Sequence, residues 1–191
     1  MGAPSLRSLL RLQAAQYGIF ANSTMTTALL TPHEFRQACG HFATGVTVIT
    51  AERSPGRVHG MTANSFTSVS LEPLLVLVCI AESAQMLRIL NQRRRFGVNV
   101  LKAGQQAIST FFAQADQPED AETALGVRFR WTKSGIPLLE DTLVQMTCNV
   151  VSTYVAGDHT IFIGELESIE VFPGDPLIFL GGKYYDFKPP R

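Results

Sequence analysis

A hydroxyl-rich segment, Gly60–Ser70, limits what this chain can fold into more than any other feature of its sequence. Seven of its eleven residues are glycine or carry a small hydroxyl or amide group, and apolar β-branched runs flank it, Gly45–Ala51 and Leu74–Ile80. Such a segment builds no core of its own, but it can present hydroxyls and backbone N–H groups to a polyanionic ligand. If it formed one strand, four polar side chains would share a face: Thr62, Asn64, Ser68 and Ser70.

Most of the remaining sequence predicts strands. Besides the two flanking runs, five segments have β-branched or alternating apolar residues bounded by turn residues: Val58–Thr67, Phe96–Leu101, Val144–Val155, Thr160–Val171 and Leu177–Leu180. Leu74–Ile80 is continuously apolar and predicts a strand buried on both faces.

Helical signals are fewer and fall irregularly between the strands. They cover three segments: Pro32–Phe42, Ala84–Gln92 and Gly104–Gln114. Ala115–Lys133 is polar and predicts a loop with a short helix near Glu119–Leu125. Strands and helices do not alternate regularly, which disfavours a doubly wound parallel sheet. We expect a mainly β fold with helical decorations, an antiparallel barrel.

Composition narrows the functional classes. Of the 191 residues, 46% are apolar and 17% charged, which is typical of a folded globular protein. The formal net charge is zero, which argues against a nucleic-acid partner. No apolar run reaches the ~18–20 residues of a membrane span, so no membrane partner is expected. Three scattered cysteines without a C-x-x-C pair indicate free thiols in a reducing cytoplasm, with no metal site.

The N-terminal region differs from the rest of the chain. Residues 1–33 contain no acid, and a weak apolar stretch makes a targeting peptide unconvincing. Thr31, Pro32 and Glu34 form a helix-start signal shortly after Met25. We therefore expect a flexible extension over residues 1–24 and one domain over residues 25–191.

Four sequence blocks, in order and at fitting distances between Thr31 and Tyr184, resemble the short-chain flavin reductases, the reductase components of two-component monooxygenases. The blocks are Phe42–Thr50, Gly60–Pro73, Phe96–Leu101 and Gly157–Gly164, the last followed by Pro176–Phe179 and Gly181–Tyr184. The resemblance implies an FMN-binding split β-barrel, a homodimer, and reduction of FMN or FAD by NADH or NADPH. It also implies that reduced flavin passes to a separate flavin-dependent monooxygenase.

The resemblance assigns flavin contacts to the hydroxyl-rich segment and its neighbours. Thr62, Ala63, Asn64 and Ser65 would meet the ring and ribityl chain, with Thr44 approaching from an adjoining turn. The flavin phosphate would be bound by three serines: Ser68, Ser70 and Ser83. Ala84-Gln85 stands where relatives often have further hydroxyls. Alternatively, these hydroxyls lie on a polar strand face and contact only solvent.

Two further sets of residues are expected near the flavin and the nicotinamide, and each has an alternative role. Phe96 and Asn99 are expected to border the flavin, although the apolar pattern around them favours a core position for Phe96. His159, Gly182 and Tyr184 are expected on the nicotinamide side, with His159 positioning that ligand; Tyr184 would either stack on it or pack at a dimer interface. The Arg93–Arg95 run predicts either a solvent-exposed helix end or a site that binds a cofactor phosphate.

Hydride transfer between two cofactors requires no catalytic side chain, so none is assigned. The sequence also has no G-x-S-x-G, H-E-x-x-H, P-loop or G-x-G-x-x-G motif. Two alternatives remain: a flavin-binding or carrier protein, and an oxidase with tightly bound FMN. Neither the choice between FMN and FAD nor that between NADH and NADPH can be read from the sequence.

Overall fold

The structure is a computed structural model and describes residues 30–117 and 121–187. The chain divides into two units, residues 1–36 and 37–191. The predicted boundary at Met25 lies outside the described residues. In the first unit Thr31 and Glu34 form a reciprocal cap: the Glu34 N–H donates to Thr31 Oγ1 at 3.2 Å, and the Thr31 N–H donates to Glu34 Oε2 at 2.9 Å.

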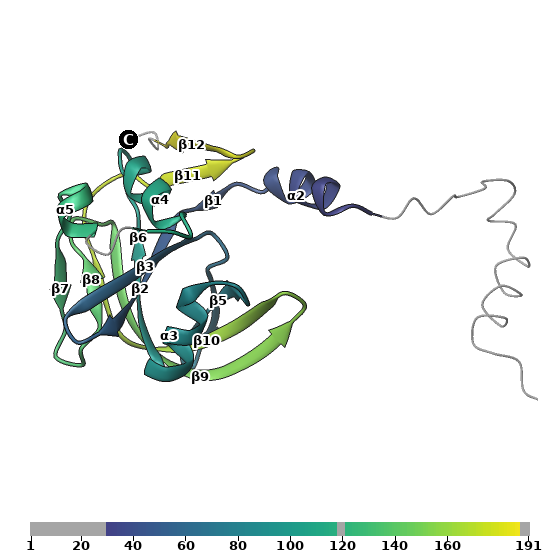
Figure 1. The fold of residues 1–191 in the computed structure, drawn as a ribbon. Helices are drawn as coiled ribbons and strands as arrows, with labels where there is room; N and C mark the ends of the chain where they lie inside the picture. The colour runs from purple at the N-terminus through teal and green to yellow at the C-terminus, as the bar shows by residue number, and fades with distance from the viewer. Residues whose placement is uncertain (1–29, 118–120, 188–191) are drawn as a thin grey trace, which may run out of the picture. The chain divides into compact units, whose positions relative to one another are not determined.

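The helices and strands follow the chain in a mixed order (Figure 1). The described helices are α2 (Pro32–Gly40), α3 (Gln85–Arg93), α4 (Gln106–Phe112) and α5 (Ala121–Leu125). The first six strands are β1 (Thr44–Gly45), β2 (Thr47–Ser54), β3 (Arg57–Ala63), β4 (Thr67–Leu71), β5 (Leu74–Ala81) and β6 (Arg95–Val100). The last six are β7 (Phe129–Trp131), β8 (Pro137–Leu139), β9 (Val144–Ala156), β10 (His159–Val171), β11 (Leu177–Leu180) and β12 (Lys183–Asp186).

A seven-stranded antiparallel sheet, in the order β3-β2-β6-β9-β10-β5-β4, dominates the second unit. Its two edge strands, β3 and β4, are consecutive in sequence and joined only by Asn64–Phe66. A linker of this length spans at most about 14 Å between the flanking Cα atoms. The sheet must therefore curl until its edges approach, yet β3 and β4 do not pair. The result is the expected split β-barrel, open between β3 and β4.

The barrel has one core inside it and a second core on the outside of β2 and β6. The inner core collects buried side chains of the curled sheet around α3, whose Met86, Leu87, Ile89 and Leu90 all face inward. The outer core contains Val48, Leu101, Phe112 and Leu139, so it lies under α4 and β8. Two small sheets complete the unit: β1-β11-β12 and β7-β8.

The structure corrects three predicted elements. Val58–Thr67 is not one strand, because β3 ends at Ala63 and β4 begins at Thr67. Leu74–Ile80 is not buried on both faces: Val76, Val78 and Ile80 are buried, while the residues between them are half-buried. The polar Ala115–Lys133 segment contains β7 as well as α5.

None of the helices within residues 30–117 and 121–187 has the length and hydropathy needed to cross a bilayer. The same residues contain no cluster of histidine, cysteine and carboxylate side chains suited to a metal ion. All three cysteines are free, with Cys39 exposed, Cys79 half-buried and Cys148 buried.

Candidate functional site

A pocket of about 630 Å³ lies between edge strand β3, the start of α3 and the end of α4. Strand β3 contributes His59, Met61 and Thr62, and α3 with the loop before it contributes Ser83, Ala84, Gln85 and Arg88. The remaining wall is Phe112–Gln117. Because β3 is an edge strand, one side of its backbone has no partner strand and its polar groups are available to a ligand.

The start of α3 is suited to an anion. Its N-cap residue, Ala84, makes no side-chain cap, and its first turn holds no acid. The first N–H groups of the helix are therefore open to a ligand beside Ser83, which is exposed. Arg88, also exposed, adds a positive charge to the same wall. This corner can bind a phosphate by charge and by hydrogen bonds.

His59 forms the floor of the pocket and is neutral near pH 7. Its side chain is only 8% exposed. Burial, with a smaller contribution from the nearby charge of Arg53, lowers the pKa of His59 from 6.5 to about 4.

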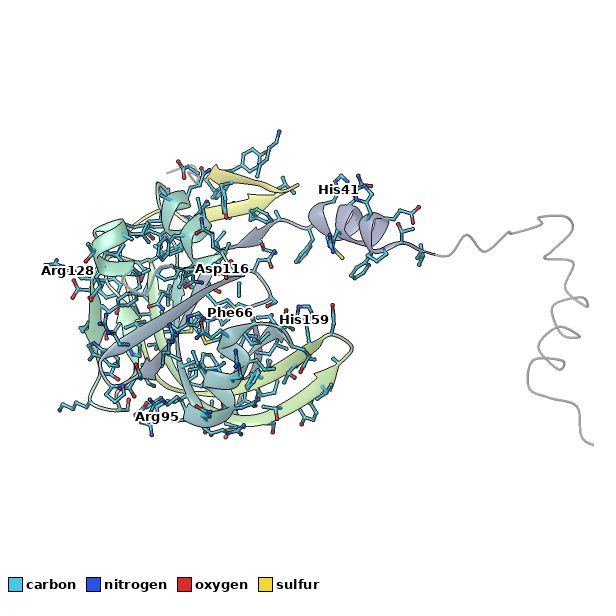
Figure 2. All side chains as sticks on the ribbon, in the orientation of Figure 1. His41, Phe66, Arg95, Asp116, Arg128 and His159 are labelled. Carbon is cyan, nitrogen blue, oxygen red and sulfur yellow. The ribbon has the colours of Figure 1, made fainter. Side chains whose placement is uncertain are left out.

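The linker Asn64–Phe66 crosses the opening of the barrel. Ser65 Oγ accepts the Cys79 N–H at 3.2 Å and donates to the Cys79 carbonyl at 3.1 Å, which fixes the linker on β5. Asn64 is exposed beside it, and Ala63 is buried in the inner core. Figure 2 labels Phe66 of this linker, with Asp116 above it and His159 beside it.

His159 begins β10, directly after the turn at Gly157-Asp158. Its Nδ1 lies 2.8 Å from Asp158 Oδ1, and it pairs across the strands with Ala81. The Asp158 carbonyl accepts the Glu82 N–H at 2.9 Å. The hairpin turn is therefore tied to the loop that carries Ser83.

A row of side chains crosses the three-stranded sheet. Thr44 pairs with Phe179 and Phe179 pairs with Tyr184, so the three side chains lie on the same face. Tyr184 packs its ring against Phe179, with centroids 5.2 Å apart, and its Oη lies 2.9 Å from Ser109 Oγ. Within the described residues Thr44 Oγ1 is buried and has no hydrogen-bond partner.

Gly182 lies in the two-residue turn between β11 and β12. Gly181 and Gly182 have φ values of 59° and 77°, the conformation that a tight hairpin of this type requires. The turn itself accounts for both glycines.

Comparison with known protein families identifies the family of this chain. The pattern of the family described as "Flavin reductase like domain" matches residues 39–188. The chain belongs to the flavin reductase family.

Similar proteins cover most of this flavin reductase-family chain. An NADH-dependent flavin reductase from Rhodococcus sp is 42% identical over 157 residues, which are 81% of this chain and 86% of the relative. The NADH-dependent flavin reductase StyB of Pseudomonas fluorescens is 38% identical over 154 residues, or 79% of this chain and 87% of StyB. The solved structure of flavin reductase PheA2 in its native state has a TM-score of 0.75 and 46% identity, and covers 84% of this chain and 100% of PheA2.

Two predicted flavin contacts lie in the interior. The Phe96 side chain is 0% exposed and packs in the inner core. Asn99 is also 0% exposed, and its amide is occupied within the protein: Nδ2 donates to the Val48 carbonyl at 2.8 Å, and Oδ1 accepts the Leu139 N–H at 2.8 Å. Neither side chain lines the pocket along β3. Phe96 takes the core position that its apolar pattern favours, and a flavin contact of either residue stays a prediction.

The predicted common face of the hydroxyl-rich segment does not form. Thr62 is on β3, whereas Ser68 and Ser70 are on β4, with a bulge between them, at the opposite edge of the sheet. Ser68 is exposed, and Ser70 Oγ accepts the Glu72 N–H at 3.2 Å. The break at Asn64–Phe66 separates the four side chains that one strand would have aligned.

The Arg93–Arg95 run binds backbone carbonyls. Arg93 Nε donates to Glu52 at 3.0 Å, Arg94 Nη2 donates to Val150 at 3.2 Å, and Arg95 donates to Ser134. Arg93 and Arg95 line a separate cavity of about 350 Å³. The run thus anchors the end of α3.

Several residues around the pocket are not predicted from the sequence, among them Arg88 and Ser109. Arg88 had a signal: it is a cation near the start of a helix, where the helix dipole disfavours positive charge. Ser109 had none, because its partners on β3 and β12 are distant in sequence.

Proposed function

We propose that this protein is an NADH-dependent flavin reductase that reduces FMN or FAD and supplies the reduced flavin to a separate flavin-dependent monooxygenase. One observation carries the proposal: in a member of the flavin reductase family, the pocket along β3 brings Thr62 together with Ser83 and the open start of α3. The named relatives from Rhodococcus sp and Pseudomonas fluorescens are NADH-dependent flavin reductases.

The chemistry of the residues around the pocket supports this proposal. Thr62 and the free edge of β3 would hold the polar edge of the ring, with Asn64 and Ser65 beside them. Ser83, the first N–H groups of α3 and Arg88 would bind the phosphate. The buried, unpartnered hydroxyl of Thr44 is the kind of group that a ligand would satisfy.

The nicotinamide side would be formed by His159, Gly182 and Tyr184. His159 is tied through the Asp158 carbonyl to the loop of Ser83, so it lies within reach of the phosphate corner. Tyr184 is connected to Thr62 through Ser109. When both ligands are bound, the nicotinamide supplies a hydride to the flavin; the residues of this chain orient the rings and exclude water.

A homodimer is part of the proposal. Register places five half-buried side chains on the outer face of neighbouring strands β5 and β10: Leu75, Leu77, Cys79, Ile161 and Ile163. Tyr154, 59% exposed, pairs with Ile161 and extends this apolar face onto β9. A second copy of the chain would cover it.

The finer choices also remain proposals. NADPH is the alternative hydride donor to NADH. A cytoplasmic location would suit three free thiols and a nicotinamide substrate.

The deciding experiment follows nicotinamide oxidation by absorbance. Purified full-length protein is mixed with NADH or NADPH, and FMN or FAD is added in turn. Oxidation that requires added flavin and saturates with it supports a reductase. Flavin binding without nicotinamide consumption would overturn the proposal in favour of a carrier, and consumption that needs no added flavin would indicate tightly held FMN.

Arg88→Gln tests the phosphate corner. We expect a rise of roughly five- to thirtyfold in the KM for FMN, because a charge-assisted hydrogen bond contributes about 1–2 kcal/mol. Riboflavin carries no phosphate, so its KM should stay unchanged. Arg57→Gln, an exposed arginine on the same strand as His59, is the matched control. Equal losses with FMN and riboflavin would remove Arg88 from the phosphate site.

A further inference from the structure

Ser109 on α4 connects the two halves of the site with two different atoms. Its side chain is 0% exposed. Its Oγ lies 2.9 Å from Tyr184 Oη on β12, and its carbonyl accepts the Thr62 hydroxyl on β3 at 2.7 Å. Thr62 is on the flavin side of the proposed function, and Tyr184 is on the nicotinamide side.

The Tyr184 ring is held at both ends. The ring packs against Phe179 with an interplanar angle of 58°, and the phenol meets Ser109. Tyr184 is half-buried and contributes to the outer core, so one part of its ring faces solvent. Without the bond to Ser109, the phenol would lose its fixed inward orientation, and the ring would be restrained by packing alone.

The contacts of Ser109 indicate that this residue does more than form part of helix α4. A serine inside a helix is a weaker helix former than alanine, and its hydroxyl commonly bonds back to a carbonyl of its own helix. Here the hydroxyl meets a side chain 75 residues away. The Ser109 carbonyl also accepts the Ala113 N–H at 3.0 Å, so it stays within the helix whatever the side chain is.

We propose that Ser109 is a positioning residue: its hydroxyl fixes Tyr184 against the nicotinamide, while its carbonyl independently fixes Thr62 against the flavin. The inference rests on the proposed function. Removing the Ser109 hydroxyl should affect the nicotinamide and not the flavin, because the contact between the Ser109 carbonyl and Thr62 stays intact.

The experiment compares Ser109→Ala, Tyr184→Phe and the double variant of the full chain. The KM for NADH and kcat come from steady-state kinetics, and the flavin Kd comes from fluorescence titration. Two exposed neighbours supply matched controls: Thr110→Ala on the same helix and Tyr185→Phe on the same strand. Thermal unfolding confirms that each variant folds. If Ser109→Ala fails to fold, Tyr184→Phe removes the same bond from its half-exposed end.

We expect each single variant to raise the KM for NADH roughly two- to tenfold, the effect of one lost hydrogen bond. The flavin Kd should change less than twofold. Because both substitutions break the same bond, the double variant should resemble the single ones.

Additive effects, or equal changes in the KM for NADH and the flavin Kd, would overturn the inference. If the parent protein is active and Ser109→Ala has the same kinetics as the parent, the inference is overturned while the proposed function stands. A parent that oxidises no nicotinamide rejects the proposed function and the inference together.

Discussion

His59 links the pocket along β3 to the stability of the fold. Its folded-state pKa of about 4 lies below the ordinary value of 6.5, because burial and Arg53 disfavour the imidazolium. Between these two values the unfolded chain binds more protons than the folded protein. The contribution of the neutral imidazole is therefore complete above pH 6.5 and is lost as the pH falls towards 4. Arg88 and Asp116 are the other charged residues lining this pocket.

We predict that His59→Asn makes unfolding less sensitive to acid. The unfolding free energy of the parent should fall more steeply than that of the variant between pH 6.5 and 4, by up to about 1.4 kcal/mol per pH unit. Urea titrations at half-unit pH steps measure the difference. His41→Asn, at an exposed histidine, is the control and should match the parent slope. Parallel curves for parent and His59→Asn would contradict the assigned pKa.

The sequence predicts the position of some polar residues in the fold better than that of others. Two residues that the sequence assigns to the flavin, Thr62 and Ser83, line the pocket along β3. The sequence does not show that the Val48 carbonyl and the Leu139 N–H hydrogen-bond the amide of Asn99 within the protein. Arg88 is not predicted, because only the four apolar residues of α3 indicate the helix. Long-range hydrogen bonds thus decide which polar side chains remain for a ligand.

At the scale of elements, apolar periodicity predicted the long strands β9 and β10 and the helix α3 closely. It failed at Asn64–Phe66, where the polar pattern continues but the backbone leaves one edge of the sheet and joins the other. Strand β12 is not predicted, because it has only four residues and begins and ends with a charged one, Lys183 and Asp186. Short strands depend on their neighbours, which the local sequence does not reveal.

The contact between α4 and β3 gives an element-scale prediction. A Cβ added at Gly60 would lie 2.5 Å from two carbons of the Phe112 ring, which is buried beneath α4. Gly60→Ala should lower the unfolding free energy by about 1–3 kcal/mol. It should also weaken flavin binding, because a shifted α4 moves Ser109 away from Thr62. Gly45→Ala, where a Cβ meets open space, is the stability control. An unchanged unfolding midpoint in Gly60→Ala would show that Phe112 moves aside freely.

For the whole molecule, the barrel class followed from strand content and from the family resemblance, but the strand order did not. Adjacent strands in sequence, β3 and β4, end at opposite edges, and the closure depends on pairings such as β2 with β6 and β5 with β10. Each of these pairings joins segments far apart in the chain. This topology places the pocket at the opening of the barrel and leaves the outer face of β5 and β10 apolar.

That outer face gives the prediction for the assembly. If a second copy covers it, light scattering of the purified protein should give twice the chain mass of 20.9 kDa. Ile163→Glu places a carboxylate between Leu77 and Ser152, its cross-strand partners, and should yield monomers because a charge buried at an interface is costly. The fold should survive, since Ile163 is half-exposed in the single chain and the carboxylate can reach water. Ala124→Glu adds the same charge at an exposed position on α5 and should stay dimeric. A dimer that persists in Ile163→Glu would place the interface elsewhere.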